Sequence, residues 1–398
     1  MAATNKVYLD NGATTRVLPE VLEAMLPYFG EVYGNPSSLH DWGEEAKDAM
    51  EESRGKVAEL LNANAEEIVF TSTGTESNNL AVKGIASAYK DKGKHIVISA
   101  IEHFSVMHSA RTLSKEGFTV TTVPVDKDGL VDPDAIAGAI QKDTVLVSIM
   151  HANGEIGTIQ PLKEIAAVTK KAGVLLHTDA VASAGNIPTD VKDLGVDALS
   201  LASNQFYGPK GVAALWVRKG VRFLPLFDGG IQEGGRRAGT DNVPGIVGMG
   251  KAAEIAKKDM SLNGERLIPL RDRLINGLTA KIERTILTGH PTRRLPGHAS
   301  FCVEFIEGEA MLMMLNMHGV AASSGSACTS KALKASHVLL ALGIDHALAQ
   351  GSLVFTIGLE NTIEDIDHVL EVFPAVVDRL RQMSPLYDKY LKARQGVK

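Results

Sequence analysis

The chain has only two cysteines among its 398 residues, Cys302 and Cys328. Two cysteines cannot form a disulfide framework, and reduced thiols are typical of the cytoplasm. No stretch approaches the roughly 18 to 20 consecutive apolar residues that a membrane helix needs. The start, MAATNKVYLD, lacks the basic and apolar regions of a signal peptide. We therefore expect a cytoplasmic protein that does not span a membrane.

The chain also has no excess of basic side chains. Its 41 Lys and Arg are outnumbered by 47 Asp and Glu, which gives a net charge of −6. This balance gives no reason to expect nucleic acid or an acidic membrane surface as a partner. There are no repeats, and the 44% hydrophobic and 22% charged content favours a globular α/β protein. The length exceeds what one core usually supports, so two domains are expected.

Between about Glu67 and Arg218, short β-branched runs alternate with amphipathic helical patterns. The runs are EIVFTS, KHIVISA, FTVTTVPV, TVLVSIMHA, GVLLHTDA, VDALSLAS and GVAALWV. Nearly continuous apolar strands separated by helices indicate a mostly parallel sheet that is buried on both faces. The sequence therefore predicts an α/β domain over residues 15–260, with about seven strands and helices on both faces of the sheet.

After about residue 260 the pattern changes. Strands near 299–305 and 352–357 and a long helix over 363–383 predict a smaller α+β domain, formed by residues 1–14 and 261–398. A helical stretch over 244–260 leads into a second helical pattern, SLNGERLIPLRDRLINGLTAKI. We place the domain joint between these two helical segments.

Polar residues follow successive strands of the predicted sheet, where ligands bind in open parallel sheets. The turn TSTGTESNN opens a helix, and its backbone N–H groups and the Thr75 hydroxyl suit a phosphate. A Thr-Gly-Thr sequence is more often only a turn, and an Asp that ends a strand is commonly a helix cap. Their coincidence at five strand ends nevertheless indicates a ligand crevice. The other residues at these ends are Glu102, His103, Asn153, Asp179, Ser203, Asn204 and Gln205.

Nine motifs in this chain resemble those of the cysteine desulfurases, a group of class V aminotransferases in the fold-type I pyridoxal-phosphate superfamily. They are YLDNGATT, YGNPSSLH, TGTESNN, EH, HANGEIG, HTDA, YGPKG, GRRAGT and SSGSACTS. They occur in the family's order over the whole length. The resemblance implies the fold-type I α/β architecture and a crevice built for pyridoxal phosphate.

The resemblance also implies a role for each matching residue. Gly74 and Thr75 would hold the cofactor phosphate, and Thr240 would reach the phosphate of a partner subunit, which implies a homodimer. Three side chains would contact the pyridine ring: His103 stacked on it, Asn153 at its hydroxyl, and Asp179 at its protonated nitrogen.

The Schiff-base lysine of the family is missing. The family reads Ser-x-His-Lys before Tyr-Gly-Pro-Lys-Gly, whereas this chain reads ASNQFYGPKG. Gln205 occupies the lysine position, and an amide nitrogen is not a nucleophile. Lys210 matches the family's second lysine and does not replace the first. We therefore expect no covalently bound cofactor, while non-covalent binding of pyridoxal phosphate stays open.

Five further crevice positions depart from the family pattern. Ala202 and Asn204 replace a Ser and a His that would donate to the phosphate, and Ala182 replaces a Gln at the ring hydroxyl. Val354 and Leu359 stand where the resemblance implies arginines, and the arginine at position 354 would clamp the substrate carboxylate. Hydrogen bonds to charged groups contribute on the order of 1.5 to 3 kcal/mol each. Tight binding of the family's ligands is therefore not expected.

Cys328 is retained, and the resemblance implies that it takes sulfur from cysteine as a persulfide. Its segment SSGSACTS is small and polar and precedes a helical pattern with Thr329 or Ser330 as cap. A helix N-terminus favours the thiolate, so Cys328 is a candidate persulfide carrier or iron–sulfur ligand, with an exposed remnant as the alternative. Cys302 lies in the alternating strand ASFCVEF and is expected to be buried.

Three functions stay open. The first is a cysteine desulfurase-like pseudoenzyme that uses Cys328 with an iron–sulfur scaffold or a sulfur-acceptor protein. The second is an enzyme with new chemistry of the lyase or hydratase type, in which His103 or Asp179 acts as acid or base. The third is a desulfurase that binds pyridoxal phosphate non-covalently or through a lysine from elsewhere.

Overall fold

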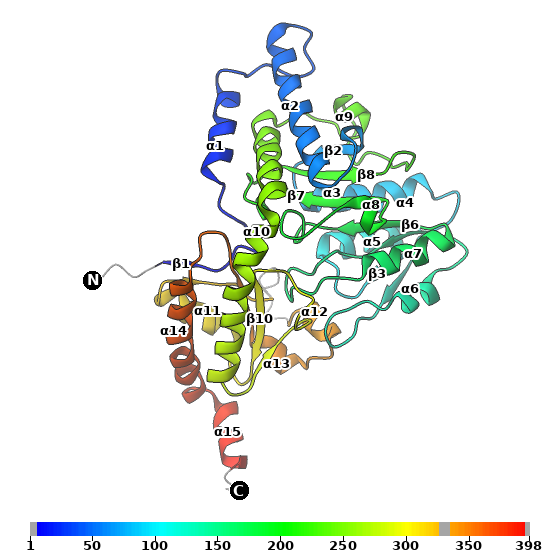
Figure 1. Ribbon diagram of the computed structural model, residues 1–398. Helices are drawn as coiled ribbons and strands as arrows, with labels where there is room; N and C mark the ends of the chain where they lie inside the picture. Colours follow the sequence, from blue (N-terminus) through cyan, green and yellow to red (C-terminus); the bar gives the residue numbers. More distant parts are fainter. Residues whose placement is uncertain (1–5, 326–334, 395–398) are drawn as a thin grey trace.

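The computed structural model describes residues 6–325 and 335–394 (Figure 1). Seven strands form the central sheet, in the order β2-β8-β7-β6-β5-β3-β4. Their bounds are β2 Ile68–Thr71, β3 His95–Ser99, β4 Thr119–Val123, β5 Thr144–Ser148, β6 Leu175–Asp179, β7 Ala198–Ala202 and β8 Ala213–Val217. Neighbouring strands are parallel except at β8, which is antiparallel to β7 and β2. The predicted mostly parallel sheet is therefore confirmed.

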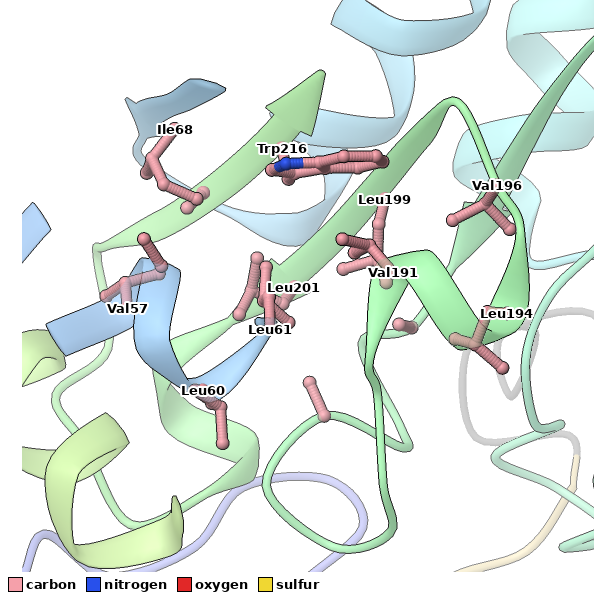
Figure 2. Close-up of a cluster of buried hydrophobic side chains, with 14 of the residues drawn as sticks. Val57, Leu60, Leu61, Ile68, Val191, Leu194, Val196, Leu199, Leu201 and Trp216 are labelled. Atoms are coloured by element: carbon pink, nitrogen blue, oxygen red, sulfur yellow. The ribbon is translucent and has the colours of Figure 1, made fainter. Parts of the chain in front are cut away.

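Helices cover both faces of this sheet. One face packs against α2 Asp41–Leu60, α7 Leu162–Ala172, α8 Val191–Leu194 and the first half of α10 Val243–Lys281. The other face packs against α4 Ile85–Ala88 and α5 Phe104–Lys115. Along β8, Trp216 faces the first core and Leu215 the second, as the two-residue period of a strand requires. Figure 2 shows the first core, where Trp216, Leu199 and Leu201 of the sheet lie with Val57 and Leu61 at the end of α2.

A second core lies around a smaller antiparallel sheet. Its central strand β10 His298–Val303 pairs with β12 Ser352–Thr356 and β9 Thr285–Leu287. The short strand β1 Val7–Tyr8 pairs in parallel with β11 Val320–Ala321, so the N-terminal segment joins this core. Helices α11 Gly308–Met317 and α14 Ile363–Gln382 supply most of its remaining apolar side chains. Strand β9 was not expected from the sequence.

The expectation of two helical segments between the cores was wrong, because α10 is one continuous helix of 39 residues. Ile246 and Met249 belong to the large core, while Leu274 and Leu278 belong to the small one. Pro269 lies inside the helix without ending it. The division into residues 15–260 and residues 1–14 with 261–398 stays a prediction.

Shorter elements connect these layers. They are α1 Pro19–Met25, η1 Leu26–Phe29, η2 Ala65–Glu67, α3 Gly74–Asn79, the π-helix η3 Leu80–Gly84, α6 Pro133–Ala139, η4 Ser203–Gln205, α9 Gln232–Gly235, α12 His337–Ala341, α13 His346–Gln350 and α15 Pro385–Arg394. Across residues 6–325 and 335–394, no helix is both long enough and apolar enough to cross a membrane.

Candidate functional site

A cavity of about 500 Å³ lies at the carboxyl ends of the central strands. Its wall contains residues that follow β2, β3, β5, β6 and β7, and it is completed by residues 10–13, residues 323–325 and Val354 of β12. Eleven residues singled out in the sequence line it: Gly74, Thr75, Glu102, His103, Asn153, Asp179, Ala182, Ala202, Asn204, Gln205 and Val354. The strand ends therefore do bring these residues into one crevice.

Four other residues from the sequence stand apart from this wall, among them Ser203, which is fully buried. Leu359 lines a neighbouring cavity of about 80 Å³, which shares Gly12 and Gln205 with the larger one. Thr240 is exposed on the segment after α9 and is not part of the wall. Cys328 lies outside the described residues. The last residue described before it is Gly325, three positions earlier in the sequence, and Gly325 lines the cavity.

The first turn of α3 forms one end of the crevice. Thr73 caps this helix, because its hydroxyl accepts a hydrogen bond from the Glu76 amide at 3.1 Å. The amides of Gly74 and Thr75 precede the point where regular helical hydrogen bonding begins, as at any helix start. A Cβ atom at position 74 would come within 2.6 Å of Val181, so glycine is needed for the close packing here. Backbone donors suited to an anion therefore lie at this end.

Asp179 lies at the end of β6, on the floor of the crevice. Its carboxylate accepts hydrogen bonds from Asn78 Nδ2 at 2.6 Å and from the Val181 amide at 2.9 Å. Burial raises the pKa of Asp179, and these two hydrogen bonds together with nearby His103 oppose that rise. The imidazole of His103 caps α5, where Nδ1 lies 2.7 Å from Ser105 Oγ and accepts from the Ser105 amide at 3.1 Å. The ring orientation of His103 is thus fixed by the protein.

Asn153 has a structural role in its own loop. Its Oδ1 accepts hydrogen bonds from the amides of Glu155 at 2.8 Å and Ile156 at 3.0 Å. Its Nδ2 donates to the Ile101 carbonyl at 2.9 Å and contacts Met150 Sδ at 3.3 Å. An amide side chain offers two donors and two acceptor lone pairs. These contacts use that capacity, so Asn153 shapes the wall of the crevice.

Gln205 and Asn204 connect the crevice to the N-terminal segment. The Gln205 side chain donates from Nε2 to the carbonyls of Gly12 at 3.0 Å and Ala13 at 3.4 Å. The Asn204 carbonyl accepts from the Thr15 amide at 2.9 Å. Asn204 and Gln205 therefore hold residues 12–15 against η4.

Further acidic or imidazole groups lie on the wall. They include Glu102, which the sequence placed at a strand end without a role, and Glu155 and His337, which it missed. Burial raises the pKa of Glu102 to about 8, although its carboxylate accepts from Ser99 Oγ at 2.6 Å and the Met150 amide at 3.0 Å. Burial likewise raises the pKa of Glu155 to about 7. His337 Nε2 donates a hydrogen bond to the Glu102 carbonyl at 3.0 Å. Glu155 could have been found in HANGEIG, whereas His337 carries no local signal.

The wall differs in charge from a typical anion site. Among the described residues, it contains no lysine or arginine. Nor do His, Cys, Asp and Glu of residues 6–325 and 335–394 gather in groups of three or more that could hold a metal. The candidate metal ligand Cys328 is outside these ranges, so that expectation stays a prediction.

Glu102→Gln should change how stability depends on pH. The carboxyl ionises near 4.5 in an unfolded chain and near 8 in the folded protein, so the folded state keeps its proton through this window. The native protein should therefore lose stability relative to the variant as pH rises from 5 to 8, on the order of 2 kcal/mol. Urea unfolding at several pH values measures the difference. For the exposed Glu360→Gln variant, the difference in unfolding free energy from the native protein should not change with pH. If the difference for Glu102→Gln did not change with pH either, the raised pKa of Glu102 would be contradicted.

The sequence profile of the family described as aminotransferase class-V matches residues 7–369. The chain belongs to the class V aminotransferase family. A cysteine desulfurase IscS of Methanosarcina thermophila is 54% identical to this chain over 383 residues. The match covers 96% of this chain and 95% of that protein. Cysteine desulfurase IscS 1 of Archaeoglobus fulgidus is 52% identical over 380 residues, 96% of this chain and 99% of its own.

Solved structures give the same result for the fold of this class V aminotransferase. A NifS-like protein superposes with a TM-score of 0.89 at 39% sequence identity, over 94% of this chain and all of that one. The resemblance to cysteine desulfurases and the fold-type I α/β architecture are therefore confirmed.

Proposed function

We propose that this class V aminotransferase is a cysteine desulfurase-like protein that does not bind pyridoxal phosphate covalently and is not a conventional desulfurase. It acts instead as a sulfur or iron–sulfur partner through Cys328. The observation that carries the proposal is Gln205 on the cavity wall, where an amide donates to the Gly12 carbonyl at 3.0 Å. An amide at this position cannot capture an aldehyde.

The crevice fits part of the cofactor and lacks the rest. Asp179, on the cavity wall, would pair with a protonated ring nitrogen, and the amides of Gly74 and Thr75 would bind a phosphate. No primary amine of the described residues lines the cavity, so the covalent anchor is absent there. Lys331 and Lys334 belong to residues 326–334, which are not described. The residues therefore fit a non-covalent ring compound better than a covalently held cofactor.

The substrate anchor of the family pattern is also missing from the wall. Val354 lies in β12, where its amide donates to the Ser323 carbonyl at 2.8 Å, and its apolar side chain lines the cavity. Leu359 places another apolar side chain on the neighbouring cavity. A cysteine carboxylate would thus meet no arginine from these two positions. This supports loss of the conventional reaction.

The position of Cys328 in the sequence supports a retained thiol function. Ser323, Ser324 and Gly325 line the cavity immediately before this segment. A cysteine thiolate is suited to carry sulfur to an acceptor protein or to ligate iron in an iron–sulfur scaffold.

A homodimer is part of the proposal. Large apolar side chains are exposed along residues 22–42, including Phe29 at 65%, Tyr33 at 69% and Trp42 at 54%. Ile231, on the segment that leads to Thr240, is 87% exposed. Exposed apolar side chains that form a continuous patch mark protein interfaces. A second copy of the chain is the partner that would place Thr240 at a neighbouring crevice.

Cys328→Ala should abolish sulfur loading. We expect the native protein to gain one sulfur atom from sodium polysulfide, which is shortened by that atom, or a brown chromophore from mixed ferrous and ferric iron with sulfide, because the thiolate is the group that accepts either. Intact-protein mass and bound iron per chain are the measurements. Cys302→Ala is the matched control, since Cys302 is buried and burial raises its thiol pKa to about 12. Equal loading of Cys328→Ala and native protein would remove the proposal.

The open cavity favours a second candidate, an enzyme of the lyase or hydratase type. Side chains have not filled the space of about 500 Å³ around His103 and Asp179. A buried carboxyl with a raised pKa and an imidazole held by Ser105 are suitable as acid and base. Turnover of an unsaturated or hydroxylated substrate that stops in both His103→Ala and Asp179→Asn would establish this function.

A further inference from the structure

His103 presents its imidazole to the crevice, where it is exposed and lines the cavity wall. A neutral imidazole has one nitrogen that donates a hydrogen bond and one that accepts, so its chemistry depends on which nitrogen carries the proton. Nδ1 contacts Ser105, whereas Nε2 has no hydrogen-bond partner within residues 6–325 and 335–394. Nε2 is therefore the nitrogen available to a ligand.

The backbone of α5 fixes Nδ1 of His103 as an acceptor. The Ser105 amide donates to Nδ1 at 3.1 Å, and this bond caps the N-terminus of the helix. A backbone amide nitrogen donates a hydrogen bond and does not accept one. An Nδ1–H group would face the amide hydrogen and leave this cap unmade. The proton of neutral His103 therefore belongs on Nε2.

A chain of buried side chains supports the same proton position. Asn78 Nδ2 donates to Asp179 Oδ2 at 2.6 Å and to Ser105 Oγ at 2.8 Å. Asn78, Ser105 and Asp179 are all buried. Because the Ser105 hydroxyl accepts from Asn78, its own hydrogen is free to bind Nδ1 of His103, which lies 2.7 Å away. The donors thus run in one direction, from Asn78 through Ser105 to His103.

We infer that Ser105 and Asn78 are positioning residues that hold neutral His103 as the Nε2–H tautomer, so that His103 meets a ligand as a hydrogen-bond donor. The ligand atom that pairs with it is an acceptor, such as a carbonyl or hydroxyl oxygen. A neutral imidazole held at a helix N-terminus can polarise a carbonyl group in this way. This role of His103 is independent of Cys328 and Gln205, because it depends only on α3, α5 and the end of β6.

The tautomer separates the roles of His103 and Asp179. A general base needs a lone pair within reach of the proton that it removes. The lone pair of neutral His103 lies on Nδ1 and is used by Ser105. An imidazolium would carry hydrogens on both nitrogens and would give up both bonds from Ser105. In the lyase or hydratase candidate, His103 would therefore polarise the substrate, and Asp179 on the same wall would transfer the proton.

Magic-angle-spinning NMR of the full chain with ¹⁵N-labelled histidine tests the tautomer directly. At about pH 8.5 an ordinary imidazole, whose pKa is about 6.5, is neutral. The His103→Gln variant lacks the ring signals and so identifies His103 among the 12 histidines. We expect the Nε2–H form of the native protein to exceed the Nδ1–H form by about tenfold or more, because two donors favour the lone pair on Nδ1.

Ser105→Ala should lower this excess by about fivefold, the equilibrium factor of one ordinary hydrogen bond. Asn78→Leu releases the Ser105 hydroxyl and should lower the excess in the same direction. Adding it to Ser105→Ala should change nothing further, since both act through one hydroxyl. Ser109→Ala is the matched control, because Ser109 Oγ donates to the Ser105 carbonyl at 2.6 Å and not to His103. It should leave the excess unchanged.

A native spectrum with the hydrogen on Nδ1 would overturn the inference, and so would an excess of Nε2–H that Ser105→Ala leaves unchanged. The native spectrum decides the tautomer even where a variant does not fold. These outcomes are separate from a failure of the proposed function, which would appear as a pyridoxyl-lysine adduct or as sulfur loading independent of Cys328.

Discussion

Gln205→Lys should give a protein that holds pyridoxal phosphate covalently, whereas the native chain should not. The variant places a primary amine on the crevice wall, where the native amide donates to the Gly12 carbonyl. A lysine Nζ can donate to the same carbonyl, so the N-terminal segment should keep its position. Asp179 and the first turn of α3 remain available to the ring and the phosphate.

Borohydride reduction followed by peptide mapping measures this difference. We expect close to one pyridoxyl group per chain at position 205 in the variant and none on any lysine of the native protein. Gln205→Met, similar in length but without a nitrogen, should behave like the native chain. A native adduct at Lys331, Lys334 or any other lysine would refute our proposal that the covalent anchor is gone.

Glu233→Ala should lower the free energy of unfolding by about 3 to 5 kcal/mol, because it breaks a buried ion pair from one side. Arg54 donates to both carboxylate oxygens of Glu233, at 2.7 and 2.8 Å, and the two side chains are 8% and 1% exposed. The Phe70 amide donates to the same carboxylate at 2.9 Å. The pair raises the pKa of the Arg54 guanidinium, so this side chain would stay charged and buried without its main partner.

Urea unfolding of three proteins separates the possible causes. Glu360→Ala removes an exposed partner of Arg16 and should cost less than about 1 kcal/mol. Replacing Arg54 by Met together with Glu233 by Leu should recover much of the loss, since both charges then leave the interior. A loss below about 1 kcal/mol for Glu233→Ala would mean that Glu51, which also contacts Arg54, compensates for the missing partner.

The central sheet and most of the crevice could be predicted from the sequence. The strands are apolar, β-branched runs buried on both faces, and this pattern is local. The carboxyl ends of parallel strands lie at one edge of a sheet, so His103 and Asp179 could be brought together without a structure. The orientation of the strands around β8 and the pairing of β9 depend on contacts between distant segments.

Other parts of the site depend on packing that no local pattern contains. His337 reaches the wall from a helix more than 200 positions after Glu102, whose carbonyl it contacts. Asn153 reads as a ligand contact from its motif, but its amide is used by the loop around it. The continuity of α10 was missed because Gly264 and Pro269, which weaken helices, lie near its middle. Packing of its two ends against the two cores stabilises the helix.

That 39-residue helix determines how the molecule can move. At 1.5 Å per residue it is a rod of about 58 Å, and both ends are embedded in apolar cores. A rod of this kind does not swing like a flexible linker, so large hinge motions between the cores would require it to bend. A change in the angle between the two cores would therefore have to bend α10, and Gly264 and Pro269 mark where its backbone is weakest.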